Sequence, residues 1–261
     1  MEVTSLGWRT DLALLRLGGS TVTDRGDHLE VRTSHNPTFW WGNFLLLDHA
    51  PGPVEAPGWV ARHREVFGAE HVSLGVHAVA AEGADLAPLV DLGLAVDRSS
   101  VMTAARVHPP PRPNHEATYR PLSGDDDWRQ QVDLSISTWD GVVDDGHRLF
   151  EQRRAATQRQ LVSDGHGQFF GAFEGERLLS SLGLVRAGDG LARFQNVGTH
   201  PEARERGLAG TLVHHASRWG LSDLGASTLV MVADPDYLAI GVYRSVGFAE
   251  SETQLSAALH R

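Results

Sequence analysis

The feature that most constrains the fold of this chain is a run of prolines near its middle. The run reads His108-Pro109-Pro110-Pro111-Arg112-Pro113-Asn114-His115, with four prolines in five positions. Proline lacks a backbone N–H and has a fixed φ, so this segment cannot continue a helix or a central strand. A chain of 261 residues is long enough for one large or two small domains. We predict domains over 1–107 and 117–261, joined by an extended linker over 108–116.

The second half carries a clear alternation of strand and helix patterns. The expected order is a strand over 118–123, helices over 127–138 and 148–163, three strands in a meander over 168–173, 178–185 and 191–199, a helix over 202–220, a strand over 228–232, a helix over 234–245 and a strand over 251–257. The strand–helix–strand order near its end predicts a parallel, right-handed crossover.

The first half is less sharply patterned. It suggests strands over 28–33, 43–48, 72–77 and 99–105 and helices over 59–67 and 86–92. Its last elements again run strand, helix, strand, helix, strand. The two halves therefore share a coarse order without an obvious likeness in sequence, which leads to the hypothesis that one fold occurs twice.

Two absences from the composition exclude several kinds of chemistry. The chain has no cysteine, which excludes disulfides, thiol nucleophiles, iron–sulfur clusters and cysteine zinc sites. All 23 basic residues are arginine, which excludes the lysine-dependent P-loop, the kinase lysine and Schiff-base catalysis. The 14 histidines include no His-Glu-x-x-His motif, and we expect no metal site.

The charge and hydropathy of the chain limit its partners and location. A net charge of −10 argues against nucleic acid, because phosphate neutralisation needs a basic face. The N-terminus does not have the pattern of a signal peptide, and no apolar stretch approaches 18 residues, so we expect neither secretion nor a membrane span. We place the protein in the cytoplasm. The sequence leaves both a monomer and a homodimer open.

The most informative stretch runs from Val197 to Leu212, where a strand leads into a small-residue turn that opens a helix. The first turn of a helix has unpaired N–H groups and a partial positive charge. Small side chains at Gly207, Ala209 and Gly210 would let a phosphate approach this backbone closely. Arg204 and Arg206 add positive charge. These residues together indicate a pyrophosphate site that needs no lysine.

A second stretch, from Asp236 to Phe248, reads as a helix that ends at Gly247. Together the two stretches resemble the GNAT superfamily of N-acetyltransferases. Its signature (Gln/Arg)-x-x-Gly-x-(Gly/Ala) is matched by Arg204, Gly207 and Ala209. The preceding strand has the family's apolar-x-apolar-x-Pro pattern in Val197, Thr199 and Pro201, with a polar residue at the second apolar position. The closing helix matches the family's pattern at Ala239, Val242, Tyr243, Gly247 and Phe248, with Asp236 where asparagine is common.

The resemblance covers about 117–257 and implies two GNAT-like domains, each an α/β arrangement of a mixed, mostly antiparallel twisted sheet flanked by helices. The first half would be the degenerate repeat of tandem GNAT proteins of the mycothiol-synthase type. It has no Arg-x-x-Gly-x-(Gly/Ala) turn between its second strand and the helix that follows, where Pro51, Gly52 and Pro53 lie instead. We therefore expect one cofactor site, in the second half.

The resemblance implies acetyl-CoA as a co-substrate and Tyr243 as the proton donor to the departing thiolate. The residues that it assigns to the cofactor are Val197, Gly198, Thr199, Arg204, Glu205, Arg206, Gly207, Leu208, Ala209, Gly210, Thr211 and Asp236. Without cysteine, the acetyl group would pass directly to an amine of a small molecule or peptide in a ternary complex. The alternative is an acyl-CoA-binding regulatory module without acceptor chemistry.

The acceptor and the general base stay open at this point. The candidate acceptors are an aminoglycoside-like amine, a polyamine, an amino-sugar thiol precursor and a protein N-terminus. Asp140, Asp144 and Asp145 lie in the loop that borders the acceptor site in this family. They are candidate bases, and the competing interpretation is that they are solvated loop residues.

Overall fold

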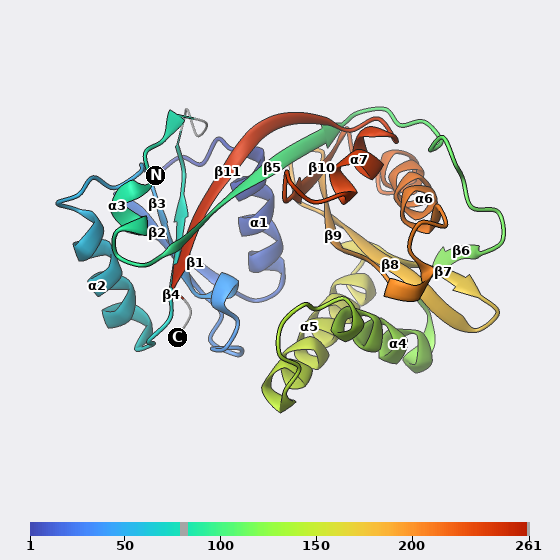
Figure 1. Ribbon diagram of the computed structural model, residues 1–261, viewed down its shortest axis with the longest axis horizontal. Coiled ribbons are helices and arrows are strands. Elements are labelled where there is room, and N and C mark those ends of the chain that lie inside the picture. Colours follow the sequence, from blue (N-terminus) through green and yellow to red (C-terminus); the bar gives the residue numbers. More distant parts are fainter. Residues whose placement is uncertain (79–82, 260–261) are drawn as a thin grey trace. The chain divides into compact units, whose positions relative to one another are not determined.

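A computed structural model describes residues 1–78 and 83–259 of the chain (Figure 1). The chain forms two compact units. Unit 1 consists of Met1–Val101, Val232–Pro235 and Ser251–Arg261, and unit 2 of Met102–Met231 and Asp236–Glu250. This division by packing differs from the predicted boundaries, because it gives the end of the chain to unit 1 and the proline-rich segment to unit 2.

Unit 1 is built on a mixed sheet. Its elements are α1 (Leu6–Leu17), β1 (Thr21–Asp24), β2 (His28–Arg32), the 3-10 turn η1 (Trp40–Gly42), β3 (Phe44–Leu47), α2 (Ala56–Phe67), β4 (Val72–Val76), α3 (Ala87–Val90), β5 (Ala95–Ala104) and β11 (Ala249–Leu259). The strand order is β1-β2-β3-β4-β11-β5. β3 and β4 are parallel, while β1–β2, β2–β3 and β4–β11 are antiparallel.

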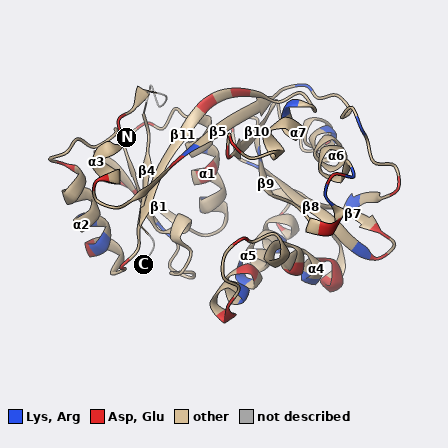
Figure 2. Ribbon diagram, viewed as in Figure 1, with Lys and Arg blue, Asp and Glu red and all other residues tan. Residues whose placement is uncertain are grey.

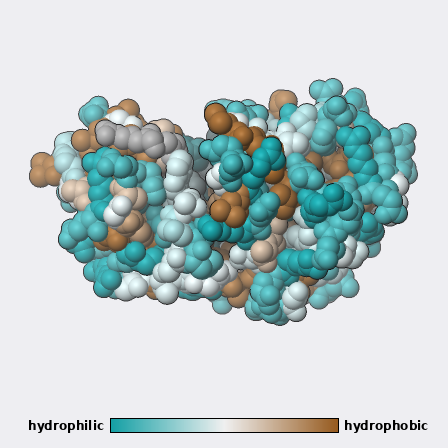
Figure 3. Space-filling model, turned by 90° about the horizontal axis from the view of Figure 1, so that it is seen from below, coloured by the Kyte–Doolittle hydropathy of each residue, from teal (hydrophilic) through white to brown (hydrophobic). Residues whose placement is uncertain are grey.

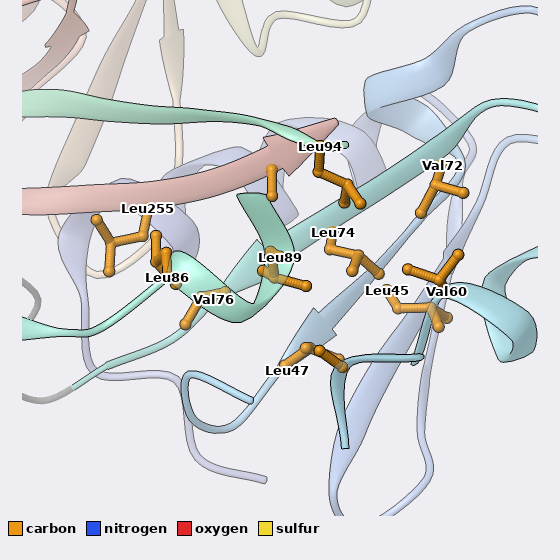
Figure 4. Packing of buried hydrophobic residues seen from close by; sticks show 12 residues of the cluster. Leu45, Leu47, Val60, Val72, Leu74, Val76, Leu86, Leu89, Leu94 and Leu255 are labelled. Carbon is orange, nitrogen blue, oxygen red and sulfur yellow. The ribbon is translucent and has the colours of Figure 1, made fainter. Parts of the chain in front are cut away.

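The core of unit 1 lies on both faces of β3, whose four residues are all buried. Leu45 and Leu47 pack with β4, α2 and α3 on one face, as the close view in Figure 4 shows. Phe44 and Leu46 pack on the other face against Trp8 of α1. A strand that is buried on both faces has a continuous apolar sequence, which explains why this strand was predictable. Helix α1 and strand β1 were not predicted.

The last strand of the chain completes the sheet of unit 1. β11 pairs with β4 from Val72 to Val76, with Leu255 opposite Val76 and Ala257 opposite Leu74. The sequence predicts this strand but assigns it to the domain over 117–261. Apolar periodicity shows that a segment is a strand and does not show which strand it pairs with.

Unit 2 contains the segments with the strongest sequence patterns. Its elements are β6 (Thr118–Pro121), α4 (Gly124–Ser137), α5 (Asp145–Ser163), β7 (Gly167–Glu174), β8 (Arg177–Arg186), β9 (Leu191–Thr199), the 3-10 turn η3 (Pro201–Ala203), α6 (Leu208–Ser222), β10 (Thr228–Ala233) and α7 (Ala239–Arg244). The strand order is β6-β7-β8-β9-β10, with β9 and β10 parallel and the other pairs antiparallel. The expected mixed sheet is confirmed.

Helices cover both faces of the sheet in unit 2. Figure 1 shows α4 and α5 on one face and α6 and α7 on the other. Neighbouring residues of β7 point in opposite directions: Phe169 packs against Trp128 of α4, and Phe170 packs against Trp219 of α6. This alternation is the period of two expected for a strand. It gives each helical layer its own apolar contact with the sheet.

Two helices of unit 2 begin later than predicted. α6 begins at Leu208 rather than 202, because Glu205 and Gly207 have φ angles of 63° and 76° that no helix accommodates. α7 begins at Ala239 rather than 234, with Leu238 at its N-cap. Asp236 therefore lies in the preceding turn and does not cap this helix. In the described ranges, no helix has the length and apolar composition to cross a membrane.

Candidate functional site

The candidate site begins where β9 and β10 part. Their parallel pairing joins Leu191 to Thr228 and continues to Arg193 and Val230. Beyond Arg193, β9 continues to Thr199 and stays paired only with β8 on its other side. We call the side of β9 that β10 leaves the open side. Backbone N–H and C=O groups that face the open side are available to an extended ligand.

A β-bulge interrupts β9 at this place. Ser181 of β8 pairs with Gly198, but Gly183 pairs with Gln195, so Asn196 and Val197 together lie opposite the single residue Leu182. Asn196 has a φ of 51°, in the left-handed region that asparagine adopts more readily than most residues. A bulge with its first residue in this conformation bends the strand and redirects its backbone groups.

The hydrogen bonds of β9 show which of its amides face the open side. The N–H of His200 donates to the carbonyl of Leu179 on β8 at 2.8 Å. Because successive residues of a strand direct their backbone groups to opposite sides, Thr199 and Val197 direct theirs to the open side. Gly198 faces β8, and its carbonyl accepts from the hydroxyl of Ser180 at 2.8 Å. Three residues of this strand were predicted to bind the cofactor. Two of them, Val197 and Thr199, therefore direct free N–H groups to the open side.

The turn before α6 presents a second set of free donors. In residues 1–78 and 83–259, the six amides from Glu205 to Gly210 have no hydrogen-bond acceptor. The amide of Thr211 is the first to bond within the helix, to the carbonyl of Gly207 at 3.2 Å. Such a row of N–H groups at a helix N-terminus is suited to an anion. Leu208 contributes only its amide to this row, because its side chain is buried in a core cluster with Ala117 and Leu179.

The two arginines of the turn are less free than the sequence suggests. Arg206 forms ion pairs with Glu174 and with Glu116, the latter at 3.1 Å, and these hydrogen bonds raise its pKa. Arg204 is exposed, and its Nε donates to the carbonyl of Thr199 at 3.5 Å. The positive character of the turn therefore comes mainly from its backbone and from Arg204.

The proline-rich segment packs on this turn. The backbone N–H of Asn114 donates to Thr211 Oγ1 at 2.8 Å, and its side-chain amide donates to the carbonyl of Arg206 at 3.0 Å. Asn114 is buried and also accepts bonds from Ala117 and Tyr119. Residues 108–116 were predicted as a linker. In the folded unit, the end of that segment forms one wall of the turn.

Tyr243 lies in α7 with only 6% of its surface exposed. Burial raises the pKa of its phenol to about 12, so the hydroxyl stays protonated at neutral pH. That hydroxyl has no hydrogen-bond partner among the described residues. Phe248, which follows α7, packs edge-on against Phe194 of β9 with ring centres 5.7 Å apart. Through this contact, the segment after α7 packs against the part of β9 that precedes the bulge.

The acidic residues between α4 and α5 have ordinary structural positions. Asp144 is the N-cap of α5 and accepts from the N–H of His147 at 2.7 Å. Asp140 and Asp145 are exposed. Acidic and basic residues alternate along α4 and α5 in Figure 2, as expected for solvated helix faces. These contacts favour the interpretation of the three aspartates as loop and capping residues.

Apolar side chains accompany these aspartates. Trp139 and Val142 are 54% and 85% exposed. The indole of Trp139 stacks on the imidazole of His147 with ring centres 4.9 Å apart. Figure 3 shows separate brown, hydrophobic patches on a largely hydrophilic face.

Sequence reasoning missed one buried carboxylate. Glu151 of α5 is buried, and this burial raises its pKa despite an ion pair with Arg154. Its spacing from Ala155, Gln158 and Leu161 places it on the buried face of the helix, which is the signal that could have found it.

Across residues 1–78 and 83–259, no three His, Cys, Asp or Glu side chains are arranged to hold a metal ion.

Unit 1 has a parallel strand–helix–strand element of its own, formed by β3, α2 and β4. The connection before α2 differs from the turn before α6. Glu55 accepts from the N–H of Gly52 at 3.0 Å, and His49 lies between Asp48 and Glu55. The carboxylate of Glu55 thus already accepts from an amide of this connection, which leaves that amide unavailable to a phosphate.

Comparisons with known proteins agree with this geometry. Residues 133–248 match the model of the acetyltransferase (GNAT) family. Residues 133–248 form a GNAT domain. No curated protein sequence matches the chain.

Three solved structures share the fold over most of both chains. The GCN5-related N-acetyltransferase from Kribbella flavida has a TM-score of 0.64 at 14% identity and covers 97% of this chain and 96% of its own. A tandem GNAT protein from the clavulanic acid biosynthesis pathway has a TM-score of 0.58 at 12% identity. The match covers 99% of this chain and 89% of that protein's chain. A functionally unknown conserved protein from Staphylococcus epidermidis has a TM-score of 0.69 at 10% identity, with 90% and 92% covered.

These likenesses establish the fold. The family match confirms the GNAT resemblance of the second half, and the two units share the fold of the tandem GNAT structure. The family match over residues 133–248 supports an acyltransferase as the general activity. The roles of individual residues and the identity of both substrates are proposals.

Proposed function

We propose that the GNAT domain binds acetyl-CoA and transfers its acetyl group to a primary amine of a small molecule or peptide, by direct attack in a ternary complex. The proposal rests on the open side of β9 lying one short 3-10 turn before the free amides at the start of α6. One row of donors suits an extended amide-containing arm, and the other suits a pyrophosphate. A protein without cysteine has no side chain that could carry the acetyl group as a thioester.

The residues of the turn fit the phosphates of such a ligand. The amides from Glu205 to Gly210 would hold the pyrophosphate, and Arg204 would add a positive charge. The carboxylate of Glu205 opposes this binding. On the open side, the backbone groups of Val197 and Thr199 would pair with the pantetheine arm.

Bound acetyl-CoA would supply the reactive thioester. The amine nitrogen would form a bond to the acetyl carbon and lose a proton to solvent, while the carbon–sulfur bond breaks and CoA leaves as a thiol. The N–H of Val197 would donate to the carbonyl oxygen as negative charge develops on it. The hydroxyl of Tyr243 would donate to the departing sulfur, because its phenol is protonated at neutral pH and has no other partner among the described residues.

Calorimetry with acetyl-CoA and the full chain tests the binding step, and we expect one site per chain. Ala209→Glu is the matched variant, because Ala209 lies in the first turn of α6 at a partly exposed position. A carboxylate there favours the helix but repels phosphate, so acetyl-CoA binding should be lost while the melting temperature holds. Two equivalent sites per chain, or unchanged binding by the variant, would contradict the proposal.

Turnover distinguishes the enzyme from a regulatory acyl-CoA-binding module. A thermal-shift series of acyl-CoAs would first select the preferred acyl chain. A panel of amines, including aminoglycosides, polyamines and short peptides, would then be screened for release of free CoA. Tight binding without release of CoA by any amine would favour the regulatory module.

A further inference from the structure

Arg154 reaches from α5 to the bulge in β9. Its guanidinium group contains only hydrogen-bond donors, so its neighbour Asn196 must present the side-chain oxygen to it. In that orientation, Nη2, Nη1 and Nε of Arg154 lie 2.8, 3.0 and 3.2 Å from Asn196 Oδ1. A side chain of one helical layer thus contacts the residue that begins the bulge.

Glu151 holds the same guanidinium group. Its Oε2 lies 2.5 Å from Nη2 of Arg154, and its side chain is 5% exposed. Burial raises the pKa of Glu151 and lowers that of Arg154, so each charge depends on the presence of the other. The three side chains form one chain of contacts from α5 to β9.

The conformation of Asn196 gives this chain of contacts a consequence for the proposed site. Asparagine tolerates a φ of 51° better than most residues, but inside a strand it keeps that conformation only where its surroundings hold it. The next residue is Val197, whose N–H faces the open side. Any relaxation of Asn196 out of the bulge would shift that N–H by one register position and turn it towards β8.

We propose that the Glu151–Arg154 pair is a positioning device that holds Asn196 in the bulge and so aims the Val197 N–H at the acyl carbonyl oxygen. This inference rests on the proposed function. It makes Arg154 a positioning residue that acts through Asn196. If the pair only stabilised the fold, its removal would lower stability but would leave the carbonyl stretching frequency of bound acetyl-CoA unchanged.

The test is the carbonyl stretching frequency of acetyl-CoA labelled with ¹³C at its carbonyl, bound to the full chain and measured by isotope-edited infrared spectroscopy. Arg154→Met should raise this frequency, since the carbonyl loses a well-placed donor. Turnover should fall about 10-fold to 100-fold with little change in the KM for acetyl-CoA. Arg153→Met is the matched control on the exposed neighbour, and it should change neither quantity.

Asn196→Gly separates positioning from general stability. Glycine adopts a positive φ without help, so this variant should keep the wild-type carbonyl frequency. Adding Arg154→Met to it should then have little further effect on the frequency. If Arg154→Met proves too unstable to bind, Arg154→Lys keeps the charge without the planar fork and should shift the frequency in the same direction.

Two outcomes overturn the inference, and they are distinguishable. A wild-type protein that binds no labelled acetyl-CoA contradicts the proposed function and the positioning device together. A bound carbonyl whose frequency is the same in wild type and in Arg154→Met contradicts the positioning device alone. An equal shift by Arg154→Met with and without Asn196→Gly also contradicts it, because the effect would not pass through Asn196.

Discussion

The carbonyl oxygen of Arg112 lies 2.4 Å from the point at which a β-carbon on Gly207 would stand. The proline-rich segment and the turn before α6 are therefore in close backbone contact. Gly207 also has a φ of 76°, which side chains disfavour. Two independent constraints thus require glycine at this position, and both come from the protein itself rather than from a bound phosphate.

Replacing Gly207 by alanine should destabilise unit 2. The left-handed backbone and the contact with a carbonyl that cannot easily move should together cost about 2–4 kcal/mol. Gly241→Ala is the control, because Gly241 lies in α7 with open space around it and an ordinary φ. It should be neutral or stabilising. Urea unfolding of both variants checks this, and equal stability would contradict the argument.

Glu205 should limit both stability and cofactor affinity. Its φ of 63° is strained for glutamate, and its carboxylate lies among the amides proposed to hold a pyrophosphate. Glu205→Gly should stabilise the protein by about 1 kcal/mol through relief of this strain and should tighten acetyl-CoA binding. Glu205→Gln keeps the strain and removes the charge, so it should tighten binding without added stability. Calorimetry and urea unfolding separate the two effects, and tighter binding by neither variant would show that the carboxylate points away from the phosphates.

The sequence predicts most strands and helices because their apolar patterns are strong, as in β3 and β10. It misses α1, whose contribution to the core depends chiefly on Trp8 and Leu12. The late start of α6 was not predictable from periodicity, since the left-handed conformation of Glu205 is a property of the folded turn. The pairing of β11 with β4 joins residues far apart in the chain and leaves no local signal.

The candidate site likewise has a part that could be predicted from the sequence and a part that could not. The turn from Arg204 to Gly207 before α6 was predictable from residue types and spacing, and the cofactor role of its residues stays a prediction. The Glu151–Arg154–Asn196 contacts join a helix to a bulge in a distant strand, and each residue alone looks like an ordinary surface residue. Tertiary contacts between single polar residues have no periodicity to reveal them.

His63 should make the protein sensitive to acid. It is fully buried, and its Nε2 accepts from the N–H of Ser73 at 3.2 Å. Burial lowers its pKa to about 4, whereas an unfolded histidine titrates near 6.5. The unfolded chain therefore binds more protons between pH 6.5 and 4, so stability is full above this window and falls as the pH drops through it.

The loss from His63 should reach about 2 kcal/mol at pH 5 and about 3 kcal/mol at pH 4. Urea unfolding at pH 7 and pH 5 measures it. His63→Gln cannot gain a proton, so its stability should depend less on pH by about this amount, although it will be less stable at pH 7. Parallel pH profiles for wild type and variant would contradict the prediction.

A shortened chain that begins at His115 should be less soluble and less active than the full chain. It retains β11 but lacks β4, so the edge of β11 from Leu255 to Leu259 loses its partner strand. Adding the separate fragment 1–107 should restore solubility if pairing of β4 with β11 is the cause. Sedimentation measures the solubility of each chain, and a turnover assay measures its activity. Full activity and solubility of the shortened chain alone would refute the prediction.

Tyr243→Phe should slow the proposed reaction without weakening acetyl-CoA binding. The ring is buried and its packing is kept in phenylalanine, so the melting temperature should hold. The hydroxyl has no partner among the described residues, and its removal leaves no orphaned group there. Binding should be unchanged because the turn from Glu205 to Gly210 supplies most of it. Turnover should fall by about 10²–10⁴-fold if proton donation to the sulfur is rate-limiting.

The control for Tyr243 is Tyr237→Phe, which removes a hydroxyl from a nearby tyrosine that is 56% exposed. It should leave turnover unchanged. A solvent isotope effect on turnover shows whether proton transfer limits the rate, and this check is needed because slow product release would hide the loss. With chemistry rate-limiting and an active acceptor amine in hand, an unchanged rate for Tyr243→Phe would make Tyr243 a packing residue. The donor to the departing sulfur would then be water or another side chain near the open side of β9.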